Sequence, residues 1–465
     1  MRALRLLFLV LMPMAASADA VDDIVASEMR RQHIPGLAIT VVKDGRIVKE
    51  AGYGLANLEH AVPVTPDTVF QSGSVGKQFT AALVMLLAGD HKLALDAPVG
   101  SYLSGTPDSW KGITMRHLLT HTSGLREDDP SVDLKRDYTE EELLQSALRI
   151  TPDSGPGEKW RYSNLGYQLL GFICSRVGGR FYGDQLRERI FEPLGMHARI
   201  ISERDLVMHR AAGYVRIEGR FFNQDWVAPS LNTTADGSLY LTVRDLAKWS
   251  LALDSDSLLD ESLKLAMWTP AKLNDGSVAP YGFGWELGEL RGRRILYHSG
   301  QWQGFSSFIA RYPDDNLVVI ALANRARASL QTIANRVAGH YVEALAEPPK
   351  RPPTAKVLKS NPLFISGTVN DDRYRAPLRR IAAGLYESQA DLGPGVMAFK
   401  VTDVDESIAL GTAFDEQWLR LGELRSIETE GEYALLELKH RTTYVFRLDA
   451  MDPHALSIIV REVAR

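Results

Sequence analysis

The segment 78–87 constrains the fold more than any other part of the chain, because it is almost wholly apolar and helical in length, with Gly89 as a stop signal. A helix that is apolar on all sides is buried and does not face water. We therefore expect this helix at the centre of a domain. The chain has 465 residues, enough for one large domain with an appendage or for two or three ordinary domains.

Strand patterns precede and follow this segment, whereas helical patterns fill the middle of the chain. The strand-like runs are 37–42, 47–48, 285–289, 294–297, 305–312 and 317–322. The other helical patterns are 21–32, 140–150, 166–177 and 243–253. Asp44-Gly45, between the first two strand-like runs, is a strong hairpin signal. Early and late strands can pair in one sheet, so we predict an α/β (α+β) fold with a central antiparallel sheet flanked by helices.

The composition changes near residue 347. The run 347–353 contains four prolines, which cannot continue a helix and are typical of a stiff linker. We expect a Pro-rich and polar linker over 347–378, after a main domain over 21–346. Short β-like runs then predict a C-terminal antiparallel β domain, a barrel or a sandwich, over 379–465. Those runs are 396–401, 433–438, 443–448 and 456–460.

Residues 1–20 have the layout of a secretory signal peptide. Arg2 and Arg5 precede an apolar run over 6–15, and small residues around Ala18 offer a cleavage site. The apolar run is too short to span a bilayer as a helix. We expect an exported protein, periplasmic or secreted, with no stable membrane insertion after cleavage. An uncleaved anchor is the alternative.

The composition excludes some classes of function. The formal net charge is −5, and a nucleic-acid-binding protein would show a basic excess or a basic face. Cys174 is the only cysteine, so no disulfide can form within the chain. It lies in an apolar helical stretch, where a packed and unreactive thiol is expected.

Ser74 and Lys77 carry the first candidate chemistry. A serine hydroxyl is a weak nucleophile until a nearby base accepts its proton. If a helix begins near Ser74, Lys77 lies one turn along on the same side, and its amine reaches the hydroxyl. The amine must be neutral for this role, which burial and neighbouring cations favour. A serine cap followed by an exposed lysine is the structural alternative, and the spacing alone does not separate the two.

Two further motifs lie downstream. Tyr162-Ser163-Asn164 precedes an apolar helical pattern, and His298-Ser299-Gly300 ends a predicted strand. Ser-x-x-Lys, then Tyr-x-Asn, then a basic residue-x-Gly resembles the serine β-lactamase and penicillin-binding-protein superfamily. Within it the chain is most similar to class C β-lactamases, D-aminopeptidases, DD-carboxypeptidases and esterases of the same fold. The resemblance covers about residues 22–345, with supporting segments at 117–125, 193–196, 281–285 and 304–305.

The resemblance implies three catalytic residues. Ser74 would attack a carbonyl and form an acyl-enzyme. Lys77 and Tyr162 would share the general-base work and return a proton to the leaving group. The sequence leaves open which of the two accepts the first proton. No metal and no cofactor is expected for this chemistry.

The resemblance also implies a set of substrate-binding residues. Asn164 would orient the substrate amide and the lysine. His298 would lend positive charge or a hydrogen bond to the substrate's carboxylate or to the tyrosine, and Gly300 completes that motif. The backbone N–H groups of Ser74 and Gln301 would form the oxyanion hole. A histidine satisfied by backbone hydrogen bonds at a strand end is the structural alternative for His298.

His298 occupies a position where lysine is common in β-lactamases proper, so we expect a different activity. The first expectation is a D-amino-acid-specific peptidase or amidase, or a DD-carboxypeptidase-like enzyme, acting on a small-molecule or peptide substrate. Carboxylic ester hydrolysis comes second and β-lactam hydrolysis third. A catalytically silent binding protein is the alternative from another class. Because histidine titrates near neutrality, carboxylate recognition through His298 would fade as pH rises.

Three other features have simpler explanations. His117 and His121 are spaced like metal ligands on a helix, but no acidic partner accompanies them and a structural role is expected. The acidic stretch 126–142 is expected to be a solvated surface insert, with a lid over the site as the alternative. Trp302 follows the third motif and either lines the pocket or packs in the core.

Overall fold

The computed structural model describes residues 19–347, except 201–203 and 218, and the strands of a C-terminal part beyond residue 362. The expected signal peptide falls outside these residues apart from its last two positions. Within the described residues, no helix is both long enough and apolar enough to cross a membrane.

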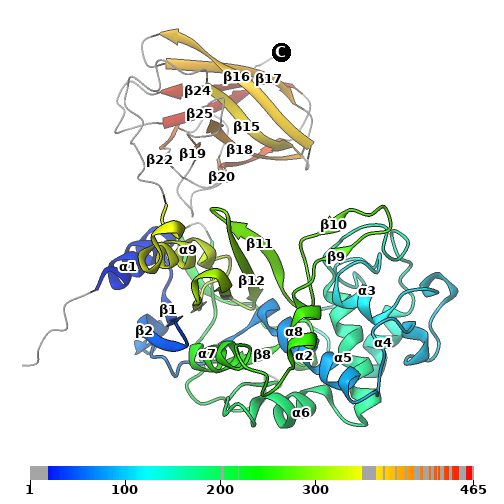
Figure 1. The fold of residues 1–465 in the computed structure, drawn as a ribbon. Helices are drawn as coiled ribbons and strands as arrows, with labels where there is room; N and C mark the ends of the chain where they lie inside the picture. The colour runs from blue at the N-terminus through cyan, green and yellow to red at the C-terminus, as the bar shows by residue number, and fades with distance from the viewer. Residues whose placement is uncertain are drawn as a thin grey trace, which may run out of the picture.

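A seven-stranded sheet with the order β11-β12-β13-β14-β1-β2-β3 organises the main part of the chain (Figure 1). Its strands are β1 (Gly36–Lys43), β2 (Arg46–Asn57), β3 (Val62–Pro63), β11 (Glu286–Leu290), β12 (Arg293–Trp302), β13 (Phe305–Tyr312) and β14 (Leu317–Ala323). Strand β1 pairs antiparallel with β14, and Leu37 lies opposite Ala323. The prediction of one antiparallel sheet from early and late strands is confirmed.

Some helices pack on the sheet and others form a helical group beside it, and most come from the middle of the chain, as predicted (Figure 1). They are α1 (Ala20–Gln32), α2 (Lys77–Gly89), α3 (Met115–Leu119), α4 (Glu140–Ala147), α5 (Asn164–Gly178), α6 (Tyr182–Leu186), α7 (Val243–Ala252), α8 (Glu261–Met267) and α9 (Leu330–Tyr341). Helix α4 ends at Ala147, before the expected residue 150.

Alternate residues of β1 enter two different hydrophobic cores. Leu37, Ile39 and Val41 pack in a core shared with α1 and α9. Ala38 and Val42 pack in the larger core that contains α2. Successive side chains of a strand point to opposite faces, so both faces of β1 are covered. This burial explains why the strand is a continuous apolar run and not an alternating one.

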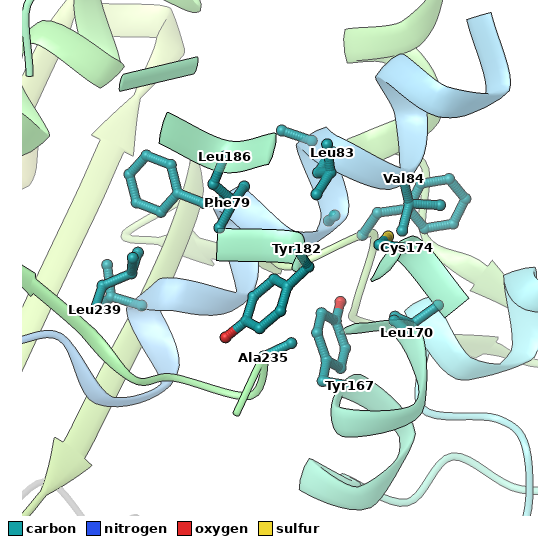
Figure 2. Close-up of a cluster of buried hydrophobic side chains, with 14 of the residues drawn as sticks. Phe79, Leu83, Val84, Tyr167, Leu170, Cys174, Tyr182, Leu186, Ala235 and Leu239 are labelled. Atoms are coloured by element: carbon teal, nitrogen blue, oxygen red, sulfur yellow. The ribbon is translucent and has the colours of Figure 1, made fainter. Parts of the chain in front are cut away.

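Helix α2 lies within the larger core, as its apolar sequence predicts. Phe79 and Leu83 of α2 belong to one cluster with Leu170 and Cys174 of α5 and with Tyr182 of α6 (Figure 2). Cys174 is free and buried, and burial raises the pKa of its thiol to about 12. The prediction of a packed thiol is therefore confirmed, and the raised pKa disfavours the reactive thiolate.

Several two- to four-residue strands were not predicted, because such short strands carry too little pattern. They form a three-stranded sheet and two hairpin-like pairs. The strands are β4 (Phe70–Gln71), β5 (Arg199–Ile200), β6 (Tyr214–Ile217), β7 (Arg220–Asn223), β8 (Leu239–Leu241), β9 (Ala271–Lys272) and β10 (Val278–Ala279). The pairing of β4 with β8 matters for the site, since β4 leads directly into the segment that carries Ser74.

The C-terminal part forms one eleven-stranded sheet. Its strands are β15 (Leu363–Val369), β16 (Asp372–Ala382), β17 (Leu385–Leu392), β18 (Gly395–Thr402), β19 (Ala409–Gly411), β20 (Trp418–Leu419), β21 (Leu424–Ser426), β22 (Glu428–Thr429), β23 (Ala434–Leu438), β24 (Thr442–Asp449) and β25 (Ser457–Glu462). The described pairs are antiparallel except β20 with β23. Phe399, Phe446 and Leu448 belong to its separate core.

The start of this sheet corrects one boundary. The sequence predicted a linker over 347–378, but β15 and the first part of β16 lie within that range. Leu363 and Ile365 are buried, as are Ala376 and Leu378. Buried residues therefore recur at the spacing of a strand. The mostly polar stretch 366–375 between these two pairs gave the segment its linker-like composition.

A buried carboxylate joins α1 to α9. Glu28 accepts hydrogen bonds from Arg31 at 2.9 Å and from Gln32 at 3.0 Å, and it also pairs with Arg336. Its side chain is 3% exposed. Burial alone would raise the pKa of Glu28, but the hydrogen bonds from Gln32 and the arginines outweigh burial and lower it.

We expect Glu28→Gln to lower the free energy of unfolding by about 1–3 kcal/mol, the usual contribution of hydrogen bonds to a charged group. The control is Asp96→Asn, which removes a carboxylate that is 74% exposed and paired with Arg116. That change should cost less than about 1 kcal/mol. Urea denaturation of the two variants measures both values. Equal destabilisation would show that the Glu28 network does not join the two helices.

Candidate active site

The backbone places Ser74 at the entrance to the buried helix. Strand β4 leads into a 3₁₀ turn, η1 (Gly73–Gly76), which continues directly into α2. Ser74 is partly exposed, whereas Gly73 and Val75 on either side of it are buried. The turn therefore presents one hydroxyl to the surface from an otherwise buried segment.

Lys77 lies beside this hydroxyl, and its side chain is fully buried. Its Nζ is 3.0 Å from Ser74 Oγ, 2.7 Å from Asn164 Oδ1 and 2.5 Å from the carbonyl oxygen of Asp236. Burial lowers the pKa of Lys77 to about 8, while the charges of Asp236 and Asp128 act in the opposite direction. Burial therefore favours the neutral amine, as the apolar run after Lys77 predicted.

Tyr162 and Asn164 flank the start of α5. Ser163, between them, caps the helix by accepting a hydrogen bond from Gly166 N–H at 3.0 Å. The Tyr162 ring lies 4.9 Å from Lys77 Nζ and packs on His121, with 4.3 Å between ring centroids. Burial raises the pKa of the Tyr162 hydroxyl well above its usual value, and the Ser74 hydroxyl partly offsets this. The phenol therefore stays protonated at neutral pH.

His298 lies in the same cluster, and both of its ring nitrogens are hydrogen-bonded to other atoms of the protein. Its Nδ1 is 2.6 Å from the carbonyl oxygen of Ser299, which can only accept, so Nδ1 carries the proton. Its Nε2 is 2.8 Å from Tyr281 Oη and accepts that hydrogen bond. Burial, together with the charge of Lys77, lowers the pKa of His298 to about 3. Of the two roles expected of His298, a positive charge or a hydrogen bond, the lowered pKa disfavours the charge at neutral pH.

Strand β12 passes against η1 with backbone-to-backbone contact. A Cβ added to Gly300 would lie 2.2 Å from the carbonyl oxygen of Ser72, and one added to Gly73 would lie 2.4 Å from Gln301 N. Gly73 also has a φ of +48°, in the left-handed region that favours glycine. This close approach brings the N–H of Gln301 beside the turn that carries Ser74.

A cavity of about 340 Å³ opens in front of Ser74. It is lined by Gly73, Ser74, Asp128, Asp129, Val132, Leu134, Leu143, Asn164, Gln168, Leu231, Thr234, Asp236, Gly237, Ser238, Gln301 and Trp302. Lys77 is buried behind two of these residues, Ser74 and Asn164, which it contacts. A larger cavity of about 680 Å³ lies next to Trp268 and Arg311, away from the Ser74–Lys77 pair.

The residues that line the cavity correct the expectation for the acidic stretch 126–142 and decide between the two alternatives for Trp302. Part of the acidic stretch 126–142 lines the cavity, so the segment is more than a solvated insert. Trp302 lines the cavity as well and donates a hydrogen bond from its indole N–H to Asn232 Oδ1 at 2.5 Å. Asp236 was not singled out from the sequence, and a single Asp-Gly pair in a loop offers no distinctive signal.

The two histidines His117 and His121 have structural contacts. His117 Nδ1 accepts a hydrogen bond from Thr114 N–H at 3.1 Å, and His121 Nδ1 accepts one from Ser163 N–H at 3.0 Å. The described residues contain no group of three His, Cys, Asp or Glu side chains able to hold a metal ion.

The arrangement of a buried lysine against a serine at the start of an apolar helix agrees with a comparison of sequences. The sequence model of the β-lactamase family matches residues 21–342. The chain belongs to the β-lactamase family. This family match covers the sheet, the helices and all three motifs, but not the C-terminal strands.

Relatives of the chain include a penicillin-binding protein and a D-aminopeptidase. The chain is 30% identical to penicillin-binding protein 4* of Bacillus subtilis over 312 residues, which are 62% of this chain and 67% of that protein. It is also 30% identical to a D-aminopeptidase of Gluconobacter oxydans over 305 residues, which are 63% of this chain and 57% of that protein. The chain therefore spans between about half and two thirds of the length of these relatives.

Solved structures share the fold of this chain. The D-amino acid amidase of Ochrobactrum anthropi SV3, complexed with L-phenylalanine amide, is 26% identical with a TM-score of 0.60, covering 70% of this chain and 96% of that chain. An octameric penicillin-binding protein homologue from Pyrococcus abyssi is 24% identical with a TM-score of 0.66, covering 94% of this chain and 99% of that chain. The second likeness extends the shared fold into the C-terminal part.

We expect Gly300→Ala to lower hydrolytic turnover by about a hundredfold, because the added Cβ pushes β12 away from η1 and displaces the reacting groups. The control is Gly288→Ala in β11, where the nearest neighbour of an added Cβ is 3.6 Å away. Turnover should be unchanged in that variant. Thermal melting of both proteins separates loss of geometry from loss of folding, and full turnover in folded Gly300→Ala would contradict the role of this contact.

Proposed function

We propose that the protein is a serine hydrolase that acts through a covalent acyl-enzyme on Ser74. The observation that carries the proposal is the contact between Lys77 Nζ and Ser74 Oγ at 3.0 Å. An amine with a pKa lowered to about 8 is neutral in part of the molecules at neutral pH and can accept the serine proton. A serine cap with an exposed lysine would show neither burial nor this contact.

The pKa directions support a division of labour between the two candidate bases. Lys77 accepts the Ser74 proton first, since the raised pKa of Tyr162 keeps the phenol protonated. Ser74 Oγ then bonds to the substrate carbonyl carbon, and the bond to the leaving group breaks after Tyr162 or Lys77 supplies it with a proton. Water hydrolyses the resulting ester and restores Ser74.

Other residues of the site hold this geometry. Asn164 accepts from Lys77 through Oδ1, which keeps the amine directed at Ser74. The N–H groups of Ser74 and Gln301 would stabilise the negative charge on the carbonyl oxygen, and losing one such donor typically costs about a hundredfold or more in turnover. His298 acts through Tyr281 and Ser299 and is a structural support in this scheme.

The substrate class that we propose is a peptide or amide that contains a D-amino acid. Relatives named D-aminopeptidase and D-amino acid amidase, at 30% and 26% identity, support this class. Carboxylic ester and β-lactam hydrolysis remain the competing activities. We also retain export of the protein as a proposal, since the residues that would carry the signal lie outside the described structure.

The test compares wild type with Ser74→Ala on four substrates. These are a D-alanyl anilide, an acyl-D-Ala-D-Ala peptide, a short-chain nitrophenyl ester and a chromogenic cephalosporin. We expect the fastest wild-type turnover on a D-amino-acid substrate and none in the variant. A fluorophosphonate probe should also form an adduct on Ser74 of the wild type, because the probe reports an activated serine.

Each other outcome selects a different activity. Turnover of the ester alone would make the protein a carboxylesterase, and turnover of the cephalosporin alone would make it a β-lactamase. Absence of both turnover and adduct would favour a silent binding protein. Equal rates in wild type and Ser74→Ala would show that another residue is the nucleophile.

The pKa of Lys77 predicts the pH dependence. With a pKa of about 8, the neutral amine makes up about one tenth of the protein at pH 7 and about nine tenths at pH 9. Because the neutral form is the base, kcat/KM on a substrate without a titrating amine, the short-chain nitrophenyl ester, should rise with pH and level off above pH 8. Initial rates measured between pH 5 and pH 10 give the pH profile of kcat/KM. A rise in kcat/KM centred near pH 6.5 would instead identify a histidine as the base. That histidine would not be His298, whose pKa is lowered to about 3.

A further inference from the structure

The wall of the cavity beside Ser74 carries negative charge. Asp128, Asp129 and Asp236 line it, and no lysine, arginine or histidine is among the described residues that line the same cavity. The remaining lining side chains are apolar or neutral. A substrate that enters this cavity therefore meets carboxylates and no partner for a carboxylate of its own.

Two of these carboxylates lie one contact away from the reacting groups. Asp128 accepts a hydrogen bond from Asn164 Nδ2 at 3.1 Å, and the Oδ1 atom of the same asparagine contacts Lys77. Asp236 accepts from Lys77 through its backbone carbonyl, and the residue lines the same cavity as Ser74. Both residues therefore border the position of the acyl group next to Ser74.

Two of these carboxylates also have one oxygen that accepts no hydrogen bond from the described residues. Asp236 Oδ1 and Asp129 Oδ2 are buried, and neither has a hydrogen-bond partner among the described residues. A buried acceptor without a partner is unfavourable by itself. Asp129 is held by its other oxygen, which accepts from Ser131 N–H at 2.9 Å. Asp236 has no such side-chain bond among the described residues, so its carboxylate is the one most in need of a donor.

Repulsion among these carboxylates also favours a cation in the cavity. Burial raises the pKa of Asp128, and the charges of Asp236 and Glu127 raise it further. Like charges held close together are stabilised by a cation placed among them. Lys77 already contacts Ser74 and Asn164, and it must lose its proton to act as a base, so it cannot serve as that cation during catalysis.

We propose that Asp128 and Asp236 bind the free α-ammonium group of the residue that is transferred to Ser74. The inference rests on the proposed function, because it concerns the substrate of that same acyl transfer. The α-nitrogen of an amino acid is two covalent bonds from the carbonyl carbon that Ser74 attacks, and the two carboxylates border the same space. The enzyme is then an aminopeptidase or amino acid amidase.

The same wall offers no partner to a carboxylate carried by the transferred residue itself. No cation is among the described residues that line this cavity, and His298 is neutral with both ring nitrogens already bonded. An acylated amine would also lose the charge that the carboxylates recognise. We therefore infer that substrates with a blocked amine are turned over slowly.

The experiment compares D-alanine p-nitroanilide with N-acetyl-D-alanine p-nitroanilide, which differ only in the charge on the amine. We expect wild type to prefer the free amine by at least about tenfold in kcat/KM, the range of a hydrogen bond to a charged group. Asp128→Asn and Asp236→Asn should each reduce that preference by roughly tenfold or more, mainly through KM. This comparison in wild type requires no variant to fold.

Glu141→Gln is the matched control. It removes one negative charge from α4, the helix whose Leu143 lines the cavity, but Glu141 is 63% exposed and does not line it. The preference for the free amine should be unchanged in this variant. Loss of the preference in Glu141→Gln as well would show a general effect of net charge and would overturn the assignment to Asp128 and Asp236.

Other outcomes separate this inference from the proposed function. Equal wild-type rates on the two anilides, or an unchanged preference in both aspartate variants, would overturn the ammonium site while fluorophosphonate labelling of Ser74 still supported the acyl-enzyme. Absence of labelling and of turnover on every substrate would overturn the acyl-enzyme proposal itself. A faster rate on the acetylated anilide would show that the cavity selects neutral acyl groups.

Discussion

The burial of Lys77 is the constraint on which the rest of the site depends. An ammonium group placed out of water is unfavourable unless it is paired or loses its proton. Helix α2 supplies the burial because almost every residue that follows Lys77 is in the core. Ser74, Asn164 and the Asp236 carbonyl supply polar contacts on the remaining side. The lysine is therefore held between the charged and neutral forms, as a base that works near neutrality requires.

The glycines around η1 let the sheet take part in this site. Gly73, Gly237 and Gly300 each leave room for another backbone segment where a Cβ would meet it at 2.5 Å or less. The sheet is closed on both faces by the two cores, so β12 has little freedom to move away. A rigid strand with its backbone against the nucleophile turn can hold an N–H group near a reacting oxygen, whereas a loop would hold it less well.

Much of this organisation was readable from the sequence, for physical reasons that differ between elements. The all-apolar run 78–87 predicted a central helix, because no other placement removes so much apolar surface from water. The Ser74, Lys77, Tyr162 and Asn164 cluster followed from motif order. The neutral state of His298 could not be read, since its hydrogen bonds to Tyr281 and Ser299 depend on tertiary packing. The stretch 126–142 has a charged, surface-like composition, and only the fold shows that part of it borders the cavity.

The acidic wall and the buried lysine act on one another. The charges of Asp236, Asp128 and Glu127 favour the ammonium form of Lys77 and so oppose the burial that lowers its pKa. On the proposed mode of binding, a substrate ammonium placed between Asp128 and Asp236 neutralises part of that negative field. Lys77 then loses its proton more readily in the complex than in the free enzyme. The kcat and kcat/KM pH profiles report these two states separately. Recognition of the amine and activation of the base would thus be parts of one electrostatic arrangement. A substrate with a blocked amine could enter the cavity, but it would not bring the positive charge that lowers the pKa of Lys77.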